Sequence, residues 1–277
     1  MQGRGKVVLV SLAALVALLA GLALATDPFA SDTGTGGEAP TPAHPPPSIV
    51  AIQTDDQAVG DLRFMPRTRR LIVQRGVRFS RYYASYSLCC PSRTTMVTGQ
   101  YAHNHRVLSN APPKGAFDAF VRHGLEDRDL PLWLQEAGYE TALVGKFLNG
   151  YGMTEGLPAD YVPPGWDEWD ALVGNTAYRY WDYTLNENGT LTPKSGEYQT
   201  NTLTDLALEF LGRQSPNTPF FLSFNTAAPH GVEHEPTAPP ALFPHPETVA
   251  AIATSPCHSR HRSTRRTSTT SQASSGT

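Results

Sequence analysis

The sequence predicts an α/β fold in which a β-sheet lies between helices. From Ser48 onward, short apolar runs alternate with amphipathic segments, which is the pattern of layered α/β architectures. Three of these apolar runs are followed closely by charged or titratable residues, as expected where a sheet carries a site at its edge. The 277 residues can form one large domain or two small ones, and a content of 40% hydrophobic and 9% aromatic residues excludes disorder throughout.

The first predicted strand covers residues 49–52, a continuous apolar run that suits a strand buried on both faces. Asp55 and Asp56 follow it, so two carboxylates lie just past the carboxyl end of the strand. On its own, such a pair is more often a turn or a helix cap than a metal site. Its meaning therefore depends on which other groups reach the same edge.

The second predicted strand covers residues 139–144 and follows a short helix over residues 131–137. Pro131 suits the first turn of that helix, and Gly138 suits its end. Lys146 then follows the strand. On its own, this lysine would be interpreted as a solvated surface charge.

The third predicted strand covers residues 220–224 and follows an amphipathic helix. One face of that helix carries apolar residues at spacings of three and four, namely Leu203, Leu206, Ala207, Phe210 and Leu211. His230 follows this strand and on its own would be a loop residue. Because ligands bind outside the carboxyl ends of the strands in open α/β sheets, we expect the two aspartates, the lysine and the histidine to face one site.

A cysteine motif lies between the first two predicted strands. Residues 89–99 read Cys-Cys-Pro-Ser-Arg-Thr-Thr-Met-Val-Thr-Gly. They resemble the signature of the sulfatase family, in which Cys-x-Pro-x-Arg directs the oxidation of the first cysteine, here Cys89, to formylglycine. Cys89 and Cys90 could instead be buried apolar residues or a vicinal disulfide, but neither alternative explains Pro91, Ser92 and Arg93.

A second stretch, residues 138–148, resembles the other sulfatase signature and lies at the expected later position. The resemblance runs from about residue 49 to residue 230 and is closest to glucosamine-6-sulfatase-type and arylsulfatase members. It implies an alkaline-phosphatase-like α/β fold, a mixed β-sheet sandwiched between helices, here incomplete at the C-terminus. Many relatives carry a histidine two positions after the signature lysine, where this sequence has Leu148, as in the glucosamine-type branch.

The resemblance also implies roles for individual residues. Cys89, as formylglycine, would be the nucleophile; Arg93 would hold it, Lys146 would bind the sulfate, His230 would act near the leaving oxygen, and Asp55, Asp56 and Cys89 would bind the metal. The residue types suit these roles, because lysine is a compact charge for a sulfonate oxygen and histidine can protonate a departing alkoxide. Paired carboxylates suit a hard cation, calcium above all, with magnesium as the rival. His103 and His105, downstream of the motif, are given no role.

The N-terminus indicates an extracytoplasmic protein. Residues 1–25 resemble a cleaved secretory signal peptide, with two positive charges, an apolar run and an Ala-Leu-Ala site. The alternative is an uncleaved membrane anchor, because the apolar run is about as long as the shortest spanning helices. Asn188-Gly189-Thr190 fits an N-glycosylation acceptor, whose use depends on the host. We therefore expect a secreted protein, or one anchored through its signal.

The remaining chain is expected to form three segments. Residues 26–47 read as a Pro- and Gly-rich linker, residues 48–246 as the N-terminal part of the catalytic domain, and residues 247–277 as a disordered basic tail. Residues 263–272 can be back-translated in a shifted frame to a peptide that resembles a segment of glucosamine-type sulfatases. One hypothesis is therefore that the tail is out of frame.

The predicted function is the hydrolysis of sulfate esters, with sulfated sugars as candidate substrates, through a formylglycine hydrate and a divalent metal. A formylglycine-generating enzyme is the implied maturation partner, and the net charge of −3 gives no reason to expect nucleic acid. Two alternatives stay open: a phosphonate or phosphate monoester hydrolase of the same superfamily, and an inactive truncated secreted fragment. The second metal pair and the further lysine of the family have no match after His230, so we expect weak or absent activity and an uncovered sheet edge.

Overall fold

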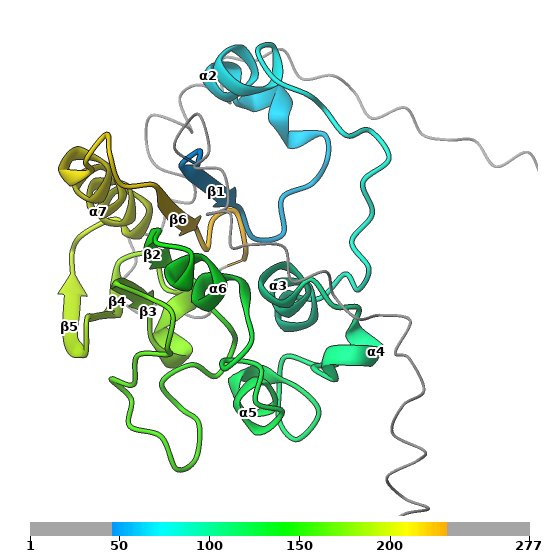
Figure 1. Cartoon of the computed structure of the whole chain (residues 1–277), viewed down its shortest axis with the longest axis vertical. Coiled ribbons are helices and arrows are strands. Elements are labelled where there is room, and N and C mark those ends of the chain that lie inside the picture. The colour runs from blue at the N-terminus through cyan, green and yellow to red at the C-terminus, as the bar shows by residue number, and fades with distance from the viewer. Residues whose placement is uncertain (1–45, 232–277) are drawn as a thin grey trace, which may run out of the picture. The chain divides into compact units, whose positions relative to one another are not determined.

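The computed structural model describes residues 46–231, which form a mixed sheet with helices on both sides (Figure 1). The predicted signal, most of the linker and the basic tail lie outside the described residues. All described residues belong to one of the two compact units of the chain, Pro45–Thr277. No helix within residues 46–231 combines the length and the apolar character that a membrane crossing requires.

The sheet has six strands in the order β1-β6-β2-β3-β4-β5. The strands are β1 (Ile49–Gln53), β2 (Glu140–Gly145), β3 (Glu168–Leu172), β4 (Asp182–Glu187), β5 (Thr190–Ser195) and β6 (Phe220–Asn225). The pairs β1·β6, β6·β2 and β2·β3 are parallel, whereas β3·β4 and β4·β5 are antiparallel. The mixed sheet of the predicted α/β class is thus confirmed.

Helices fill the connections between the strands. They are α2 (Pro66–Thr68), α3 (Cys89–Thr98), α4 (Ala102–His105), α5 (Ala116–Arg122), α6 (Leu130–Glu136) and α7 (Gln199–Arg213), with the short 3₁₀ helices η2 (Asp61–Phe64) and η4 (Gly174–Tyr178) and the π-helical turn η3 (Arg69–Val73). The predicted helices before the second and third strands correspond to α6 and α7. In α6, the side chain of Asp129 caps the first turn by accepting a hydrogen bond from the amide of Leu132.

Two cores form because strand side chains alternate between the faces of the sheet. In β2, Ala142 and Val144 point into the core covered by α7, whereas Leu143 points into the core covered by α3, α5 and α6. Figure 1 shows α7 on one side of the sheet and these three helices on the other. The second core is rich in aromatic side chains, among them Phe117, Phe120, Phe147, Tyr151 and Trp169.

The three strands predicted from apolar runs are β1, β6 and β2, and they lie side by side in parallel. Their carboxyl ends therefore meet at one edge of the sheet, as expected from the sequence. The predicted burial of β1 on both faces was wrong, because Ile49, Val50 and Ile52 are 38%, 45% and 58% exposed. In the part of the chain that the structure describes, β1 pairs with β6 alone and is an edge strand. An apolar run shows that a segment is hydrophobic, but it does not show which strands or helices cover that segment in the fold.

Asp170 of β3 is a buried carboxyl in the sheet, with 4% of its surface exposed. Burial raises its pKa from 3.8 to about 7, and the nearby carboxylates of Glu168 and Glu187 add to the rise. Between about pH 4 and about pH 7, the folded protein therefore keeps a proton on Asp170 that the unfolded chain has lost. The contribution of this group to stability is full below the unfolded pKa of about 4 and is lost as the pH rises to about 7.

Asp170→Asn is expected to remove this fall in the unfolding free energy with rising pH. Because one pKa unit corresponds to about 1.4 kcal/mol, the wild-type protein should lose about 4 kcal/mol of unfolding free energy through this residue between about pH 4 and about pH 8, and the variant should not. Urea unfolding at the two pH values measures the difference. Asp205→Asn, at an exposed aspartate of α7, is the control. An unchanged pH dependence in Asp170→Asn would contradict the assignment.

Candidate active site

The cysteine motif forms the start of helix α3. Cys89 is the first helical residue, after Leu88 in an extended conformation. Pro91 falls in the first turn. Backbone amides in the first turn have no hydrogen-bond partner within the helix, so a proline costs no hydrogen bond there. Cys90 and Val97 pack into the core, whereas Cys89 is half-buried and lines a surface pocket of about 760 Å³. The helix thus buries one cysteine and presents the other.

The environment of Cys90 makes it unreactive. Its sulfur accepts a hydrogen bond from the backbone amide of Asn149 at 3.1 Å, and its thiol lies 3.2 Å from the side-chain oxygen of that residue. Burial raises the pKa of Cys90 from 9.0 to about 12. Because the thiolate is the reactive form, Cys90 stays an inert thiol in the core. Both Cys89 and Cys90 are free cysteines, so the alternative of a vicinal disulfide does not apply.

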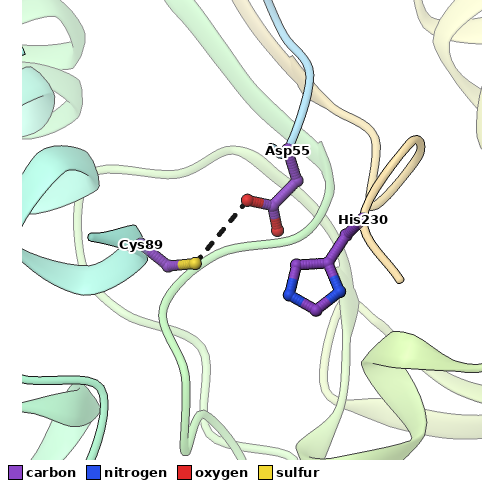
Figure 2. A group of neighbouring side chains, drawn as sticks. All are labelled: Asp55, Cys89 and His230. Carbon is purple, nitrogen blue, oxygen red and sulfur yellow. Dashed lines mark hydrogen bonds between the residues drawn. The ribbon is translucent and has the colours of Figure 1, made fainter. Parts of the chain in front are cut away.

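Asp55 connects the carboxyl end of β1 to the cysteine motif. It is 5% exposed, and its backbone amide donates to the carbonyl oxygen of Ala228 at 3.3 Å. Its Oδ1 lies 3.6 Å from Cys89 Sγ, the contact drawn in Figure 2. Its Oδ2 pairs with the ammonium of Lys146 and lies 3.8 Å from an Arg93 nitrogen. Asp55 is therefore the hub of the site.

The backbone before Lys146 requires glycine. Gly145 has φ +110°, and a Cβ at this position would lie 2.0 Å from the carbonyl oxygen of Asn225. This close approach lets the amide of Lys146 donate to the same oxygen at 2.8 Å. The Gly-Lys pair of the second signature thus turns the chain at the end of β2 and sends the lysine into the site, where it is 2% exposed.

Arg93 lies one helical turn after Cys89 and is 5% exposed. One nitrogen of its guanidinium donates to the carbonyl oxygen of Lys146 at 2.8 Å. Burial lowers the pKa of Arg93, and the charge of Asp55 opposes this fall. The buried charges beside Cys89 are therefore one carboxylate against two cations, Arg93 and Lys146. Such an excess of buried positive charge favours an anionic ligand.

His230 reaches the site from the loop after β6. Its Nδ1 lies 2.6 Å from the carbonyl oxygen of Gly231, which can only accept, so Nδ1 carries a proton. Its Nε2 lies 3.5 Å from Oδ2 of Asp56. The hydroxyl of Tyr180 donates to the backbone carbonyl of His230 at 2.8 Å and holds this loop. Nε2 is therefore the nitrogen that faces the pocket and can exchange a proton there.

Five of the six predicted site residues converge, namely Asp55, Cys89, Arg93, Lys146 and His230. Figure 2 shows the side chains of Asp55, Cys89 and His230 arriving from the loop after β1, the start of α3 and the loop after β6. Asp56 is set apart, because its side chain is 64% exposed and contacts His230 and not Asp55. Its φ of +57° is the left-handed turn that sends the two neighbouring aspartates in different directions.

The described residues fit a divalent cation. The ligand atoms of Asp55, Cys89 and His230 all lie within 4.8 Å of one another. The sulfur of Cys89 stands where the oxygen of a formylglycine would be, so the modified site would offer oxygen from two residues, while Nε2 of His230 stays free to exchange a proton. Asp56, on the same loop as Asp55, lines the same pocket. Each of these carboxylates is the oxygen-donor type that hard cations prefer, although Asp56 does not point toward Asp55.

The two histidines left without a role do not enter the site. His105 is 1% exposed; its Nδ1 accepts a hydrogen bond from the amide of Val107, so Nε2 carries the proton that faces the Thr95 hydroxyl at 3.2 Å. Burial lowers the pKa of His105, and the ring is a neutral structural group. His103 is exposed and stacks on Tyr101.

Two residues beside the site were missed from the sequence, Tyr178 and Asn149. The ring of Tyr178 lies over Lys146 and next to His230. Asn149 donates to the Tyr178 hydroxyl and also contacts Cys90. Asn149 falls just after the second signature, which was the available signal, whereas Tyr178 belongs to no motif and is brought in by the fold.

Comparison with known proteins identifies relatives of the chain. Residues 47–274 match the family model described as Sulfatase. The N-acetylglucosamine-6-sulfatase of Homo sapiens is 37% identical over 192 residues, which cover 66% of this chain and 34% of that protein. An extracellular sulfatase SULF-1 homolog of Drosophila melanogaster is 37% identical over 196 residues, which cover 68% of this chain and 17% of that protein.

A solved structure with a similar fold contains a sugar sulfate. It is described as a complex with its substrate D-glucosamine-2-N,6-O-disulfate, with a TM-score of 0.51, 30% identity, and coverage of 66% of this chain and 35% of that chain. Together with the mixed sheet between helices, this similarity confirms the alkaline-phosphatase-like fold class. The chain spans about a third or less of the length of these relatives.

Proposed function

The chain belongs to the sulfatase family, and from this premise we propose that it hydrolyses sulfate esters, with Cys89 as the precursor of the nucleophile. The observation that carries the proposal is the buried pair of cations beside Cys89. Arg93 and Lys146 share one carboxylate, so the site has positive charge to spare for a sulfate group. Preorganised charge of this kind stabilises the negative charge that gathers on the sulfuryl oxygens in the transition state.

The proposed nucleophile is an aldehyde hydrate at position 89. A thiol would form a stable thiosulfate-type ester, whereas a hydrate has one hydroxyl to attack and another to expel the product. Oxidation of Cys89 to formylglycine is assigned to a formylglycine-generating enzyme. The position of Cys89, half-buried at the pocket while Cys90 is enclosed in the core, supports this choice between the two cysteines.

Two steps complete the reaction. In the first, one hydroxyl of the hydrate gives its proton to solvent water as its oxygen bonds to sulfur, the bond from sulfur to the alcohol oxygen breaks, and His230 donates the proton that the departing alkoxide needs. In the second, the remaining hydroxyl gives its proton to solvent water and becomes the aldehyde oxygen, while sulfate departs with the electrons of the carbon–oxygen bond. Water restores the hydrate. Arg93 and Lys146 hold the sulfuryl oxygens throughout.

We infer sulfated sugars of the glucosamine type as the substrate class. The names of the human relative and of the ligand in the solved structure support this inference. Secretion through cleavage of residues 1–25 is part of the same proposal, supported by the extracellular sulfatase among the relatives. A sulfated sugar outside the cytoplasm and a secreted hydrolase would meet in the same compartment.

The cation is proposed to be calcium, with magnesium as the alternative; when bound, it supplies positive charge beside the sulfate oxygens. Asp56→Asn is expected to weaken calcium binding by about tenfold or more, because it removes one carboxylate from the site. Calorimetric titration with calcium, magnesium and zinc chlorides measures this without any turnover. Asp127→Asn, at an exposed aspartate away from the pocket, is the control. Equal calcium affinity in Asp56→Asn and the wild type would remove Asp56 from the metal site.

The reaction class is tested by comparing esters after expression with a formylglycine-generating enzyme and calcium. We expect an aryl sulfate and a glucosamine 6-sulfate to be hydrolysed faster than an aryl phosphonate or phosphate. Faster release from the phosphonate or phosphate would replace the proposal by the related hydrolase of the same superfamily. No turnover together with an unmodified Cys89 would favour the alternative of an inactive fragment.

A further inference from the structure

Tyr178, the last residue of η4, lies between two groups that the proposed function assigns to the substrate. The ammonium nitrogen of Lys146 is 4.3 Å from the centre of its ring. The ring of His230 is 4.5 Å away, centre to centre, and tilted by 38°. Lys146 follows β2 and His230 follows β6, so a residue of a third segment joins the ends of two strands.

The hydroxyl end of Tyr178 is tied to the cysteine helix. Its oxygen accepts a hydrogen bond from the side chain of Asn149, whose backbone amide donates to Cys90 at 3.1 Å. Burial raises the pKa of Tyr178, and the charge of Lys146 opposes the rise, so the phenol stays neutral. The ring is thus anchored at its far end, and its face is left for the lysine.

The chemistry of this contact differs from that of the ion pair with Asp55. A carboxylate neutralises the charge of Lys146, whereas an aromatic face attracts the ammonium without supplying a counter-charge. The ring therefore helps to hold Lys146 in place without neutralising its charge beyond what the ion pair with Asp55 does. The lysine side chain has four flexible carbons, and fixing it when an anion binds costs rotamer entropy. A contact that already restricts the side chain before binding reduces this cost.

Resting on the proposed function, we propose that Tyr178 is a positioning residue that orients Lys146 and His230 toward a bound sulfate group. It is the ring, and not the hydroxyl, that performs this role. The proposal separates two parts of one side chain, and conservative variants can test them apart.

The test is a titration of the full chain with inorganic sulfate in the presence of calcium chloride. Tyr178→Leu, which removes the ring, is expected to bind sulfate about tenfold more weakly than the wild type. Tyr178→Phe, which keeps the ring, should bind within about twofold. Tyr178→Met is a second ring-free variant if the leucine variant does not fold. Tyr139→Leu is the matched control, because it removes another half-buried tyrosine, whose hydroxyl donates to Pro47.

A spectroscopic signature distinguishes positioning from general structural support. The ring over Lys146 should shift the NMR signals of the lysine side chain next to the ammonium, and this shift should disappear in Tyr178→Leu and persist in Tyr178→Phe. Wild-type sulfate affinity in Tyr178→Leu, or an equal loss in Tyr178→Phe, would overturn the proposal.

A variant of the lysine separates this proposal from the function on which it rests. Lys146→Met should weaken sulfate binding by about ten- to a hundredfold whatever the role of Tyr178. If Lys146→Met still binds sulfate like the wild type, the proposed sulfate site is wrong and the role of Tyr178 falls with it. If Lys146→Met loses binding and Tyr178→Leu does not, only the inference about Tyr178 fails.

Discussion

Replacing Cys89 by alanine should abolish measurable sulfate ester hydrolysis, because it removes the thiol that is converted to the aldehyde hydrate. Arg93, Lys146 and Asp55 are left in place, so binding of inorganic sulfate should persist in the variant. Parallel measurement of turnover and of sulfate affinity shows the two effects separately. A large loss of affinity together with turnover would indicate that the variant damages the site as a whole.

The neighbouring cysteine provides the matched control for this prediction. Cys90→Ser keeps a polar group near Asn149 in the core, and we expect formylglycine formation at position 89 and turnover to be retained. The cost should be a modest loss of stability, about 1 kcal/mol, since the hydroxyl is smaller and more polar than the thiol. Loss of turnover in Cys90→Ser with full turnover in Cys89→Ala would reverse the assignment of the two cysteines.

Replacing Lys146 by methionine should weaken sulfate binding by about ten- to a hundredfold. A hydrogen bond to a charged group contributes about 1.5–3 kcal/mol, and the lysine is one of two cations that face the anion. Its loss also leaves Asp55 and Arg93 as a balanced pair, so the excess of positive charge disappears. Methionine keeps most of the side-chain volume, and 2% exposure at this position requires such a replacement.

Lys194→Met is the control for charge removal. Lys194 pairs with Glu187 at 3.3 Å on the hairpin of β4 and β5, where both side chains are partly exposed. A surface pair of this kind contributes about 0–1 kcal/mol, and sulfate binding should not change. Equal sulfate affinities in Lys146→Met and Lys194→Met would contradict the assignment of Lys146.

The functional half of the sheet could be predicted because its strands are uniform apolar runs that end in charged residues. β2 and β6 have this character, and β1 was recognised for the same reason. β3 was not predicted, because Glu168 and Asp170 interrupt its apolar pattern even though Asp170 is buried. Periodicity cannot reveal a buried carboxyl that keeps its proton.

The turn between β4 and β5 is visible in the sequence as an Asn-Gly pair, but it was not predicted as a turn. Asn188-Gly189 was interpreted as part of a glycosylation acceptor, but it is also the two-residue turn between these strands. The φ angles of +51° and +87° are those of a type I′ turn, for which Asn-Gly is the preferred pair. The carbonyl of the Asn188 side chain also accepts from the amide of Trp169, which ties the turn to β3.

The candidate site was predictable as a set of residues and not as a geometry. The ends of three strands and the cysteine motif gave Asp55, Cys89, Lys146 and His230. Asp56 turns away from Asp55 because of one left-handed backbone angle, and the sequence gives no sign of this angle. Tyr178 could not be found at all, since its contacts are made across the fold and no motif contains it.

The most direct measurement is mass spectrometry of the tryptic peptide of residues 82–93 after expression with a formylglycine-generating enzyme. We predict an aldehyde or its hydrate at Cys89 and an unmodified thiol at Cys90. A plain thiol at both positions, in a protein that is folded and has met the maturing enzyme, would contradict the account.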